Sequence, residues 1–161
     1  MSQDLDRFTT IISNFQRREI QIPLAACLLR GFVQAIGYDE AVAVATAEIQ
    51  KEAMISGRKM AEQYGGNSLD ELLRVVKDIW AQEGALEFDI LENTGQILSF
   101  DVHRCRYVEL YDQLGVKEFG YCLSCCRDAS YARGFNNRIK LFRSHTIMQG
   151  AIKCDFRFIL E

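Results

Sequence analysis

The stretch Glu87-Phe-Asp-Ile-Leu-Glu-Asn-Thr-Gly-Gln-Ile-Leu-Ser-Phe-Asp-Val102 decides the fold class of this 161-residue chain. Apolar and polar residues alternate at 87–90 and again at 98–102, which is the period of half-buried β-strands. Asn93-Thr94-Gly95 lies between the two runs and contains turn-forming residues. The stretch therefore predicts a β-hairpin, because two alternating runs joined by a short turn pair as neighbouring strands.

Two further runs near the C-terminal end alternate in the same way. They cover residues 139–141 and 154–160 and are separated by a turn that includes Gln149-Gly150. One face of the second run is apolar and starts with Cys154, whereas the other face carries Asp155 and Arg157. We therefore expect Cys154 to face the core side of a sheet whose strands are mainly antiparallel.

Upstream of the hairpin, apolar residues recur at helical spacing. Pro23 suits the first turn of a helix that runs to Gly37. Asp39 can cap another helix over residues 40–63, which ends at Gly65-Gly66. Before these two helices, one further apolar stripe consists of Phe8, Ile11, Ile12 and Phe15.

Three more segments have helical spacing. Ser68-Leu69-Asp70-Glu71 is a capping box that opens a helix ending near Trp80. Residues 104–114 and 118–133 indicate two helices after the hairpin, the first of which stops at Gly115. The sequence predicts one α+β domain over residues 1–161, with a helical half at 1–82 and strands and helices at 83–161. The expected architecture is an N-terminal helical layer packed with a small, mainly antiparallel sheet that helices interrupt.

Composition limits the class of protein. Hydrophobic residues make up 48% and charged residues 25%, with a single proline, which excludes a disordered or collagen-like chain. The 19 basic and 22 acidic side chains are spread over both halves, so we expect no nucleic-acid partner. Apolar stretches such as 22–29 are shorter than a membrane span, and the first residues lack the pattern of an export signal. We expect a cytoplasmic protein without a membrane partner, and a homo-oligomer is compatible with the sequence.

Five of the six cysteines lie in the last third of the chain, and we expect thiols rather than disulfides there. Cys105 follows the second strand of the hairpin, in the first turn of the next helix and between Arg104 and Arg106. Backbone amides at a helix start and nearby positive charge both lower the pKa of a thiol. The alternative is a small buried hydrophobe at a strand-to-helix junction.

The densest group of polar residues and thiols contains Cys122, Cys125, Cys126 and Asp128. On a helix the three cysteines share one face, and Asp128 lies over the next turn beside Cys125. A carboxylate beside a thiol can act as a base, orient a water or join the thiol in binding a metal. The alternative is a cysteine-rich helix that packs on the sheet.

Four other side chains could take part in binding or proton transfer. Arg143 and Arg157 lie on or beside strands, where each could hold a substrate carboxylate or face solvent. His103 and His145 are the only histidines in the chain, and we expect both at the surface.

Six short motifs occur in order between residues 100 and 158. They are Phe100-Asp-Val-His-Arg-Cys105-Arg-Tyr, Leu123-Ser-Cys125-Cys-Arg-Asp128, Gly134-Phe-Asn136, Ile139-Lys-Leu141, Thr146-Ile-Met-Gln-Gly150 and Cys154-Asp-Phe-Arg-Phe158. This combination resembles the L-2-amino-thiazoline-4-carboxylic acid hydrolase family. The resemblance implies hydrolytic opening of a 2-aminothiazoline ring to a carbamoyl-cysteine product. It assigns site positions to Cys105, Cys125, Asp128 and Cys154, whereas Cys122 and Cys126 lie outside the motif pattern. Lys153 stands where the family often has a histidine.

We expect Cys105, Cys125 and Cys154 to line one pocket with Asp128. A thiolate of Cys105 or Cys125, or a water held by the group, would add to the ring carbon between sulfur and nitrogen. Asp128 would then handle the proton, and Arg143 would anchor the carboxylate of the small-molecule substrate.

Other assignments use the same residues. No resident metal is favoured, although a zinc site on the three thiols is an alternative. A small-molecule binding or sensing module with the same pocket and no turnover is a second function, and a structural partner subunit is a third.

Overall fold

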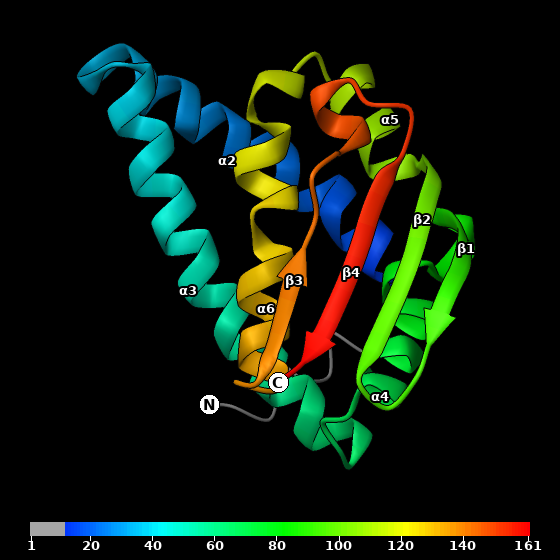
Figure 1. Ribbon diagram of the computed structural model, residues 1–161. Coiled ribbons are helices and arrows are strands. Elements are labelled where there is room, and N and C mark those ends of the chain that lie inside the picture. Colours follow the sequence, from blue (N-terminus) through cyan, green and yellow to red (C-terminus); the bar gives the residue numbers. More distant parts are fainter. Residues whose placement is uncertain (1–11) are drawn as a thin grey trace.

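The computed structural model describes residues 12–161 and contains one four-stranded sheet. All neighbouring strands are antiparallel, and their order is β1-β2-β4-β3. The strands are β1 (Leu86–Asn93), β2 (Ile97–Cys105), β3 (Ile139–Phe142) and β4 (Cys154–Leu160). The predicted hairpin is β1 and β2, and both C-terminal runs are strands. Figure 1 shows that the helices lie on one side of this sheet, which confirms the α+β class.

Two long helices form the N-terminal layer, and shorter helical segments connect the strands. The α-helices are α2 (Asn14–Ile36), α3 (Tyr38–Tyr64), α4 (Leu69–Val75), α5 (Arg106–Gln113) and α6 (Arg127–Phe135). The π-helical turns are η1 (Val76–Trp80) and η4 (Tyr121–Cys125). The 3-10 turns are η2 (Gln82–Gly84), η3 (Lys117–Phe119) and η5 (Ile147–Gln149).

Helix α2 differs from the prediction because Pro23 lies inside it rather than in its first turn. The helix starts earlier because Ser13 forms a capping box with Gln16. Pro23 leaves the carbonyl of Glu19 without its intrahelical donor, and both residues lie on an exposed part of the helix where water can compensate. Of the predicted N-terminal stripe, Phe15 is buried in α2 and Ile12 precedes it, whereas Phe8 and Ile11 lie outside the described residues.

Of the other predicted helix boundaries, the structure confirms two at the end of α3 and the start of α4 and differs at two further places. Ser68 forms the expected capping box, and Gly65 ends α3 in the left-handed conformation. Asp39 does not cap α3, because the helix already begins at Tyr38 and Asp39 falls in its first turn. The single helix predicted over 118–133 is wrong, since η3, η4 and α6 occupy this region as three segments.

The buried apolar residues form two clusters that meet at the start of the motif region. One cluster fills the space between the sheet and α3, α4 and α6, with Phe100, Phe158 and Leu72 among its fully buried side chains. The other joins α2, α5 and η4 around Tyr111. Cys105 contacts both clusters. The end of β2 therefore lies at the boundary between the two halves of the core.

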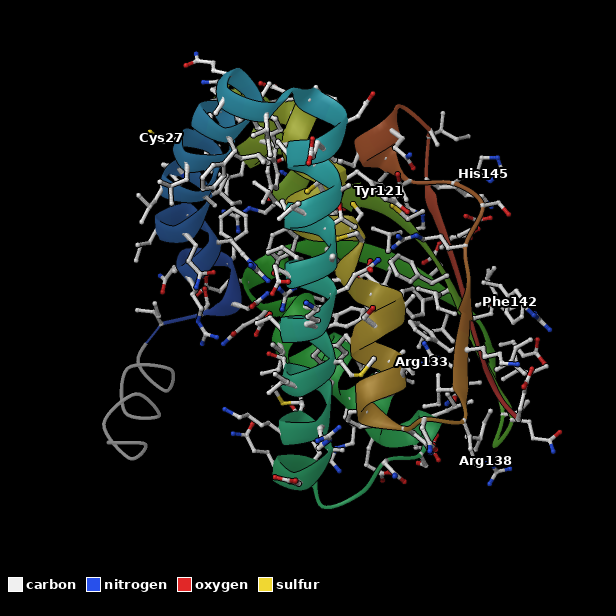
Figure 2. All side chains as sticks on the ribbon, turned by 90° about the vertical axis from the view of Figure 1, so that its left-hand side faces the viewer. Cys27, Tyr121, Arg133, Arg138, Phe142 and His145 are labelled. Atoms are coloured by element: carbon white, nitrogen blue, oxygen red, sulfur yellow. The ribbon has the colours of Figure 1, made fainter. Side chains whose placement is uncertain are left out.

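Helices α3 and α6 pack backbone against backbone, side by side in Figures 1 and 2. A Cβ atom at Gly57 would lie closer than 3.0 Å to backbone atoms of Tyr131, and one at Gly134 would approach Met54 equally closely. Only glycine allows this approach without displacing a helix. The contact fixes the position of α6, which carries Asp128 in its first turn.

Candidate functional site

A cleft of about 1090 Å³ opens between the two core clusters. Cys105 from the end of β2, Cys125 from η4, Asp128 from α6 and Cys154 from the start of β4 all line it. Each of the three thiols feels the negative charge of Asp128, which places the four groups within electrostatic reach of one another. The expected convergence of three cysteines and one carboxylate is therefore present in the structure.

The thiol of Cys105 is not activated as the sequence suggested. Cys105 is the N-cap residue of α5, where the nearby backbone N–H groups of Val108 and Tyr107 act to lower its pKa. Burial has the larger effect and raises the pKa of Cys105 to about 11. Arg104 and Arg106 do not compensate for burial. Arg104 pairs with Glu87 and Glu109, and Arg106 donates to the carbonyl of Glu83 and stacks over Phe15.

The π-helical turn η4 separates Cys125 from its neighbours, so the three cysteines do not share one face. Cys122 and Cys126 are buried, and the sulfur of Cys126 donates to the carbonyl of Cys122 at 2.8 Å. Thr46 on α3 donates to the sulfur of Cys122 at 3.3 Å. A π-turn winds more slowly per residue than an α-helix, which rotates Cys125 toward the cleft. Burial and then Asp128 raise the pKa of Cys125 well above its usual range.

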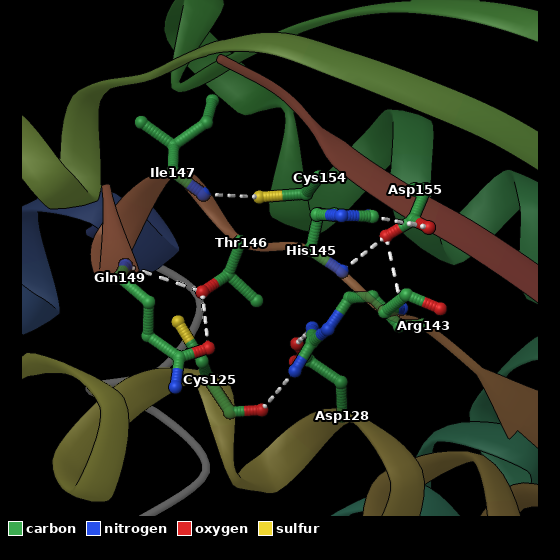
Figure 3. A network of polar contacts seen from close by, with 10 residues as sticks. Cys125, Asp128, Arg143, His145, Thr146, Ile147, Gln149, Cys154 and Asp155 are labelled. Atoms are coloured by element: carbon green, nitrogen blue, oxygen red, sulfur yellow. Dashed lines mark hydrogen bonds and ion pairs between the residues drawn. The ribbon is translucent and has the colours of Figure 1, made fainter. Parts of the chain in front are cut away.

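Asp128 and Arg143 form a close ion pair at the wall of the cleft (Figure 3). Arg143 also donates to the carbonyl of Cys125 at 2.9 Å, and its guanidinium lies over the Phe156 ring at 4.9 Å. The side chains of Arg143 and Asp128 are only 8% and 21% exposed. Burial raises the pKa of Asp128 above its usual value, although Arg143 opposes this effect. The carboxyl group can therefore both accept and donate a proton closer to neutral pH than an exposed aspartate.

The segment before β4 holds Cys154 in place. The sulfur of Cys154 accepts a hydrogen bond from the backbone N–H of Ile147 at 3.2 Å (Figure 3). The carboxylate of Asp155 accepts hydrogen bonds from the backbone N–H groups of Ser144 and His145, which ties the segment back to β4. Cys154 is 7% exposed and belongs to the core cluster of the sheet, as its place in the alternating run predicted.

The histidines and Lys153 offer no acid–base group at the cleft. The side chains of His103 and His145 are 47% and 65% exposed and pair with Asp89 and Asp155, which agrees with the expected surface position. Lys153 forms an ion pair with Asp101 at 2.5 Å and does not line the cleft. Among the motif residues, the groups at the cleft that could transfer a proton are therefore Asp128 and the three thiols.

The zinc alternative finds no suitable ligand set in residues 12–161. No group of three or more His, Cys, Asp or Glu side chains in this part of the chain is arranged to hold a metal ion. The guanidinium of Arg143 lies against Asp128, and the sulfur of Cys154 already accepts the Ile147 amide. A cation would have to displace both contacts.

The helical half contributes polar residues to the cleft that sequence reasoning missed. Arg18 on α2 and Glu52 on α3 both line it. Glu52 forms an ion pair at 2.5 Å with Arg127 on α6, which also lines the cleft. Tyr111 is fully buried, lines the same cleft, and its hydroxyl has no hydrogen-bond partner.

Fold and site together define an α+β domain with an internal cleft lined by thiols and one carboxylate. Residues 17–158 match the family model of L-2-amino-thiazoline-4-carboxylic acid hydrolase, and the chain belongs to this family. No curated protein sequence matches the chain.

Two solved structures are similar in fold. One is the phenol-responsive sensory domain of the transcription activator PoxR with phenol, at 15% identity and a TM-score of 0.55 over 85% of this chain and 73% of that chain. The other is a trafficking protein particle complex subunit 3 from Naegleria fowleri covalently bound to palmitic acid, at 12% identity and a TM-score of 0.52 over 89% of this chain and 96% of that chain. At these identities the likeness concerns the fold alone.

Proposed function

We propose that the protein is a hydrolase that opens the ring of a cyclic amidine carboxylic acid of the 2-aminothiazoline type. The observation that carries the proposal is the meeting of Cys105, Cys125 and Cys154 with Asp128 in one cleft. Membership of the hydrolase family supports the same substrate class. The electrophile is the ring carbon between sulfur and nitrogen, which needs an attacking oxygen, a base for its proton and a proton donor for the leaving sulfur.

The raised thiol pKa values favour water as the attacking group. A neutral buried thiol is a poor nucleophile, because the thiolate is the reactive form. Asp128 takes a proton from water while the oxygen bonds to the ring carbon, and the electron pair of the carbon–nitrogen double bond moves to the ring nitrogen, which receives this proton from Asp128. Asp128 then takes the proton of the new hydroxyl group and passes it to the sulfur as the carbon–sulfur bond breaks. The oxygen becomes the carbonyl of a carbamoyl group on the former ring nitrogen, and the sulfur becomes a free thiol.

The remaining residues orient these groups. Arg143 is a positioning residue that holds Asp128 and the carbonyl of Cys125. The role of Arg143 as carboxylate anchor stays a prediction, and its guanidinium is already engaged by these two partners. The three thiols form a weakly polar wall that can receive the ring sulfur without competing for the proton on Asp128.

Single substitutions test these roles. We expect Asp128→Asn to lower kcat by about 10²- to 10⁴-fold, which is the usual contribution of a general base. Cys105→Ser, Cys125→Ser and Cys154→Ser should each lower the rate less than Asp128→Asn does. The exposed Cys27 provides the matched control, and Cys27→Ser should leave the rate unchanged.

Two outcomes would count against this scheme. Near-wild-type rates in all four site variants would refute the proposed function. If water attacks directly, intact-protein mass spectra during turnover show no adduct. A covalent adduct lost only in one cysteine variant would assign the attack to that thiol instead.

A second function is a ligand-binding module that uses the same cleft without turnover. The specific observation in its favour is the size of the cleft, about 1090 Å³, together with its largely buried aromatic and thiol lining. Both similar structures contain an organic molecule, which is phenol in the PoxR sensory domain and covalently bound palmitic acid in the trafficking protein particle complex subunit. Such a module would bind thiazoline acids or phenols with a rise in Tm and release no product.

A further inference from the structure

We propose that Arg18 and Tyr111 form an anion-binding pole of the cleft that holds the carboxylate of the ligand. This inference rests on the proposed function, because it assigns the carboxylate end of the same substrate class. Arg18 lies on α2, far in sequence from the motif cysteines, and Tyr111 lies on α5, two turns after Cys105. The cleft would thus hold the ring at Asp128 and the acid group at Arg18.

The first observation is the hydroxyl of Tyr111. Its side chain is fully buried and lines the cleft, yet the hydroxyl has no hydrogen-bond partner. Leaving such a group unpaired costs stability, so an orphaned donor at a cleft wall indicates a missing acceptor. The neighbouring Tyr107 differs in this respect, since its hydroxyl bonds to Asn14 and to the carbonyl of Trp80.

The second observation is that Arg18 forms no ion pair with an acidic side chain of residues 12–161. Two other guanidinium groups of the cleft are neutralised, because Arg127 pairs with Glu52 and Arg143 pairs with Asp128. Within the described residues Arg18 makes one hydrogen bond, to Gln21 at 3.3 Å. Burial raises the pKa of Tyr111, and Arg18 is close enough to oppose this effect; the charge of Arg18 also acts on Asp128. A carboxylate at this point would pair with Arg18 and accept the Tyr111 hydroxyl.

Equilibrium dialysis with a matched ligand pair tests the assignment. The probes are 2-aminothiazole-4-carboxylate, an aromatic analogue that resists ring opening, and 2-aminothiazole, which lacks the acid. We expect the wild-type protein to bind the acid about 10- to 100-fold more tightly than the neutral ring. Arg18→Gln should abolish this preference, and Tyr111→Phe should reduce it without lowering stability.

Arg30→Gln is the control on the same helix, because Arg30 pairs with Glu118 outside the cleft and should leave the preference unchanged. An unchanged preference in Arg18→Gln would overturn the anion pole. Acid preference without turnover of any thiazoline would refute only the proposed function. Ring opening at equal rates for substrates with and without the acid group would refute only the anion-binding pole.

A different observation carries a second inference, which concerns the outer face of α2. Large apolar side chains on this face are exposed, with Leu24 at 65%, Leu28 at 54% and Phe32 at 57%. They are spaced four residues apart and form a ridge along the helix. By length and composition alone α2 could also cross a membrane, which is weak evidence in itself. We infer that the ridge packs against the same helix of a second copy of this chain.

Shape supports a second copy as the occupant. A groove of about 380 Å³ runs beside the ridge, lined by Cys27 and Gly31 of α2 and by Leu114 and Val116. Gly31 leaves open space at its Cβ position. Because ridge and groove lie next to each other, a two-fold axis places each ridge in the groove of its partner, as an isologous interface requires.

Area and connectivity also favour this occupant over a membrane. With roughly 200 Å² per large side chain, the ridge together with Ile20 and Ile36 exposes about 590 Å² of apolar surface. A stable interface buries about 800 Å² per partner, and the groove supplies part of the remainder. The opposite face of α2 carries Ile22, Ala26 and Leu29 of the helical core, so a membrane-spanning α2 would have to leave that core.

Sedimentation equilibrium provides the test. We expect a dimer for the wild-type protein, a monomer for Leu28→Glu, and a dimer for the control Ile152→Glu, whose residue is 90% exposed elsewhere. Cys27 is the exposed cysteine, and Figure 2 shows it on the outer side of α2, so a short bismaleimide should join two copies through it. A monomeric wild-type protein would overturn the inference. Flotation of that monomer with phosphatidylcholine vesicles would identify a membrane as the occupant.

Discussion

Replacing Gly57 with alanine should destabilise the protein and displace the site. The new Cβ would lie closer than 3.0 Å to the carbonyl oxygen of Tyr131 and to the backbone nitrogen of Phe135. Both obstacles are backbone atoms, so no side chain can turn away and α6 has to move by about 1 Å to restore normal contact. Overpacking of this kind costs about 3 kcal/mol. The better helix propensity of alanine returns about 1 kcal/mol. The net loss of unfolding free energy is then about 2 kcal/mol.

Gly31→Ala is the matched control, because nothing lies within 4 Å of its Cβ position. There the same substitution should stabilise the chain by about 0.5 to 1 kcal/mol. Both variants carry Leu28→Glu, so that self-association at α2 does not enter the comparison. Urea unfolding followed by the fluorescence of Trp80 reports on α6, since this single tryptophan packs edge to face against Tyr131, with 5.4 Å between the ring centroids.

The difference between the two alanine variants should therefore be about 3 kcal/mol. Because α6 carries Asp128, Gly57→Ala should also lower ring opening by about 100-fold, the usual effect of a 1 Å misplacement. Equal stabilities of the two variants would refute the backbone contact between α3 and α6. Loss of stability with an unchanged rate would show that the position of Asp128 does not depend on it.

Three further predictions concern the thiols and a helix cap. The folded-state pKa of Cys105, about 11, lies above its ordinary value near 9. The contribution of this thiol to the free energy of unfolding is therefore complete below pH 9 and is lost as pH rises, by about 2 kcal/mol at pH 11. In urea unfolding measured over this pH range, Cys105→Ala should remove the loss. In the Leu28→Glu variant, where no second copy covers Cys27, iodoacetamide at neutral pH should modify Cys27 first and leave Cys125 unmodified, as peptide mass spectrometry would show. Rapid labelling of Cys125 would contradict its burial. Ser68→Ala should cost about 1 kcal/mol through loss of the capping box with Glu71, and thermal unfolding without a change in Tm would contradict it.

The strands and the place of Cys154 could be predicted because they depend on local alternation. The hairpin around Asn93-Thr94-Gly95 and the inward face of β4 follow from a period of two, and the structure confirms both. Helix boundaries were less predictable where local signals compete. Pro23 normally marks the start of a helix, but in α2 the Ser13 capping box starts the helix earlier.

Much of the site could not be predicted, because it depends on burial and on partners distant in sequence. The sequence places Arg104 and Arg106 beside Cys105, but their ion pairs and stacking turn them away, and burial raises the thiol pKa. The π-turn that turns Cys125 into the cleft has no signature in a single sequence. Arg18 meets the motif residues only through tertiary packing, which no spacing along the chain reveals.

The most direct measurement is the reaction of the wild-type protein with 2-amino-thiazoline-4-carboxylic acid in water enriched in ¹⁸O. We expect one new thiol for each ring opened and one ¹⁸O atom in the carbamoyl carbonyl of the product. Neither signal should exceed background with the folded Asp128→Asn variant. The proposed hydrolysis would be contradicted if a folded wild-type protein released no thiol. It would also be contradicted if ring opening were equally fast with and without the carboxylate of Asp128.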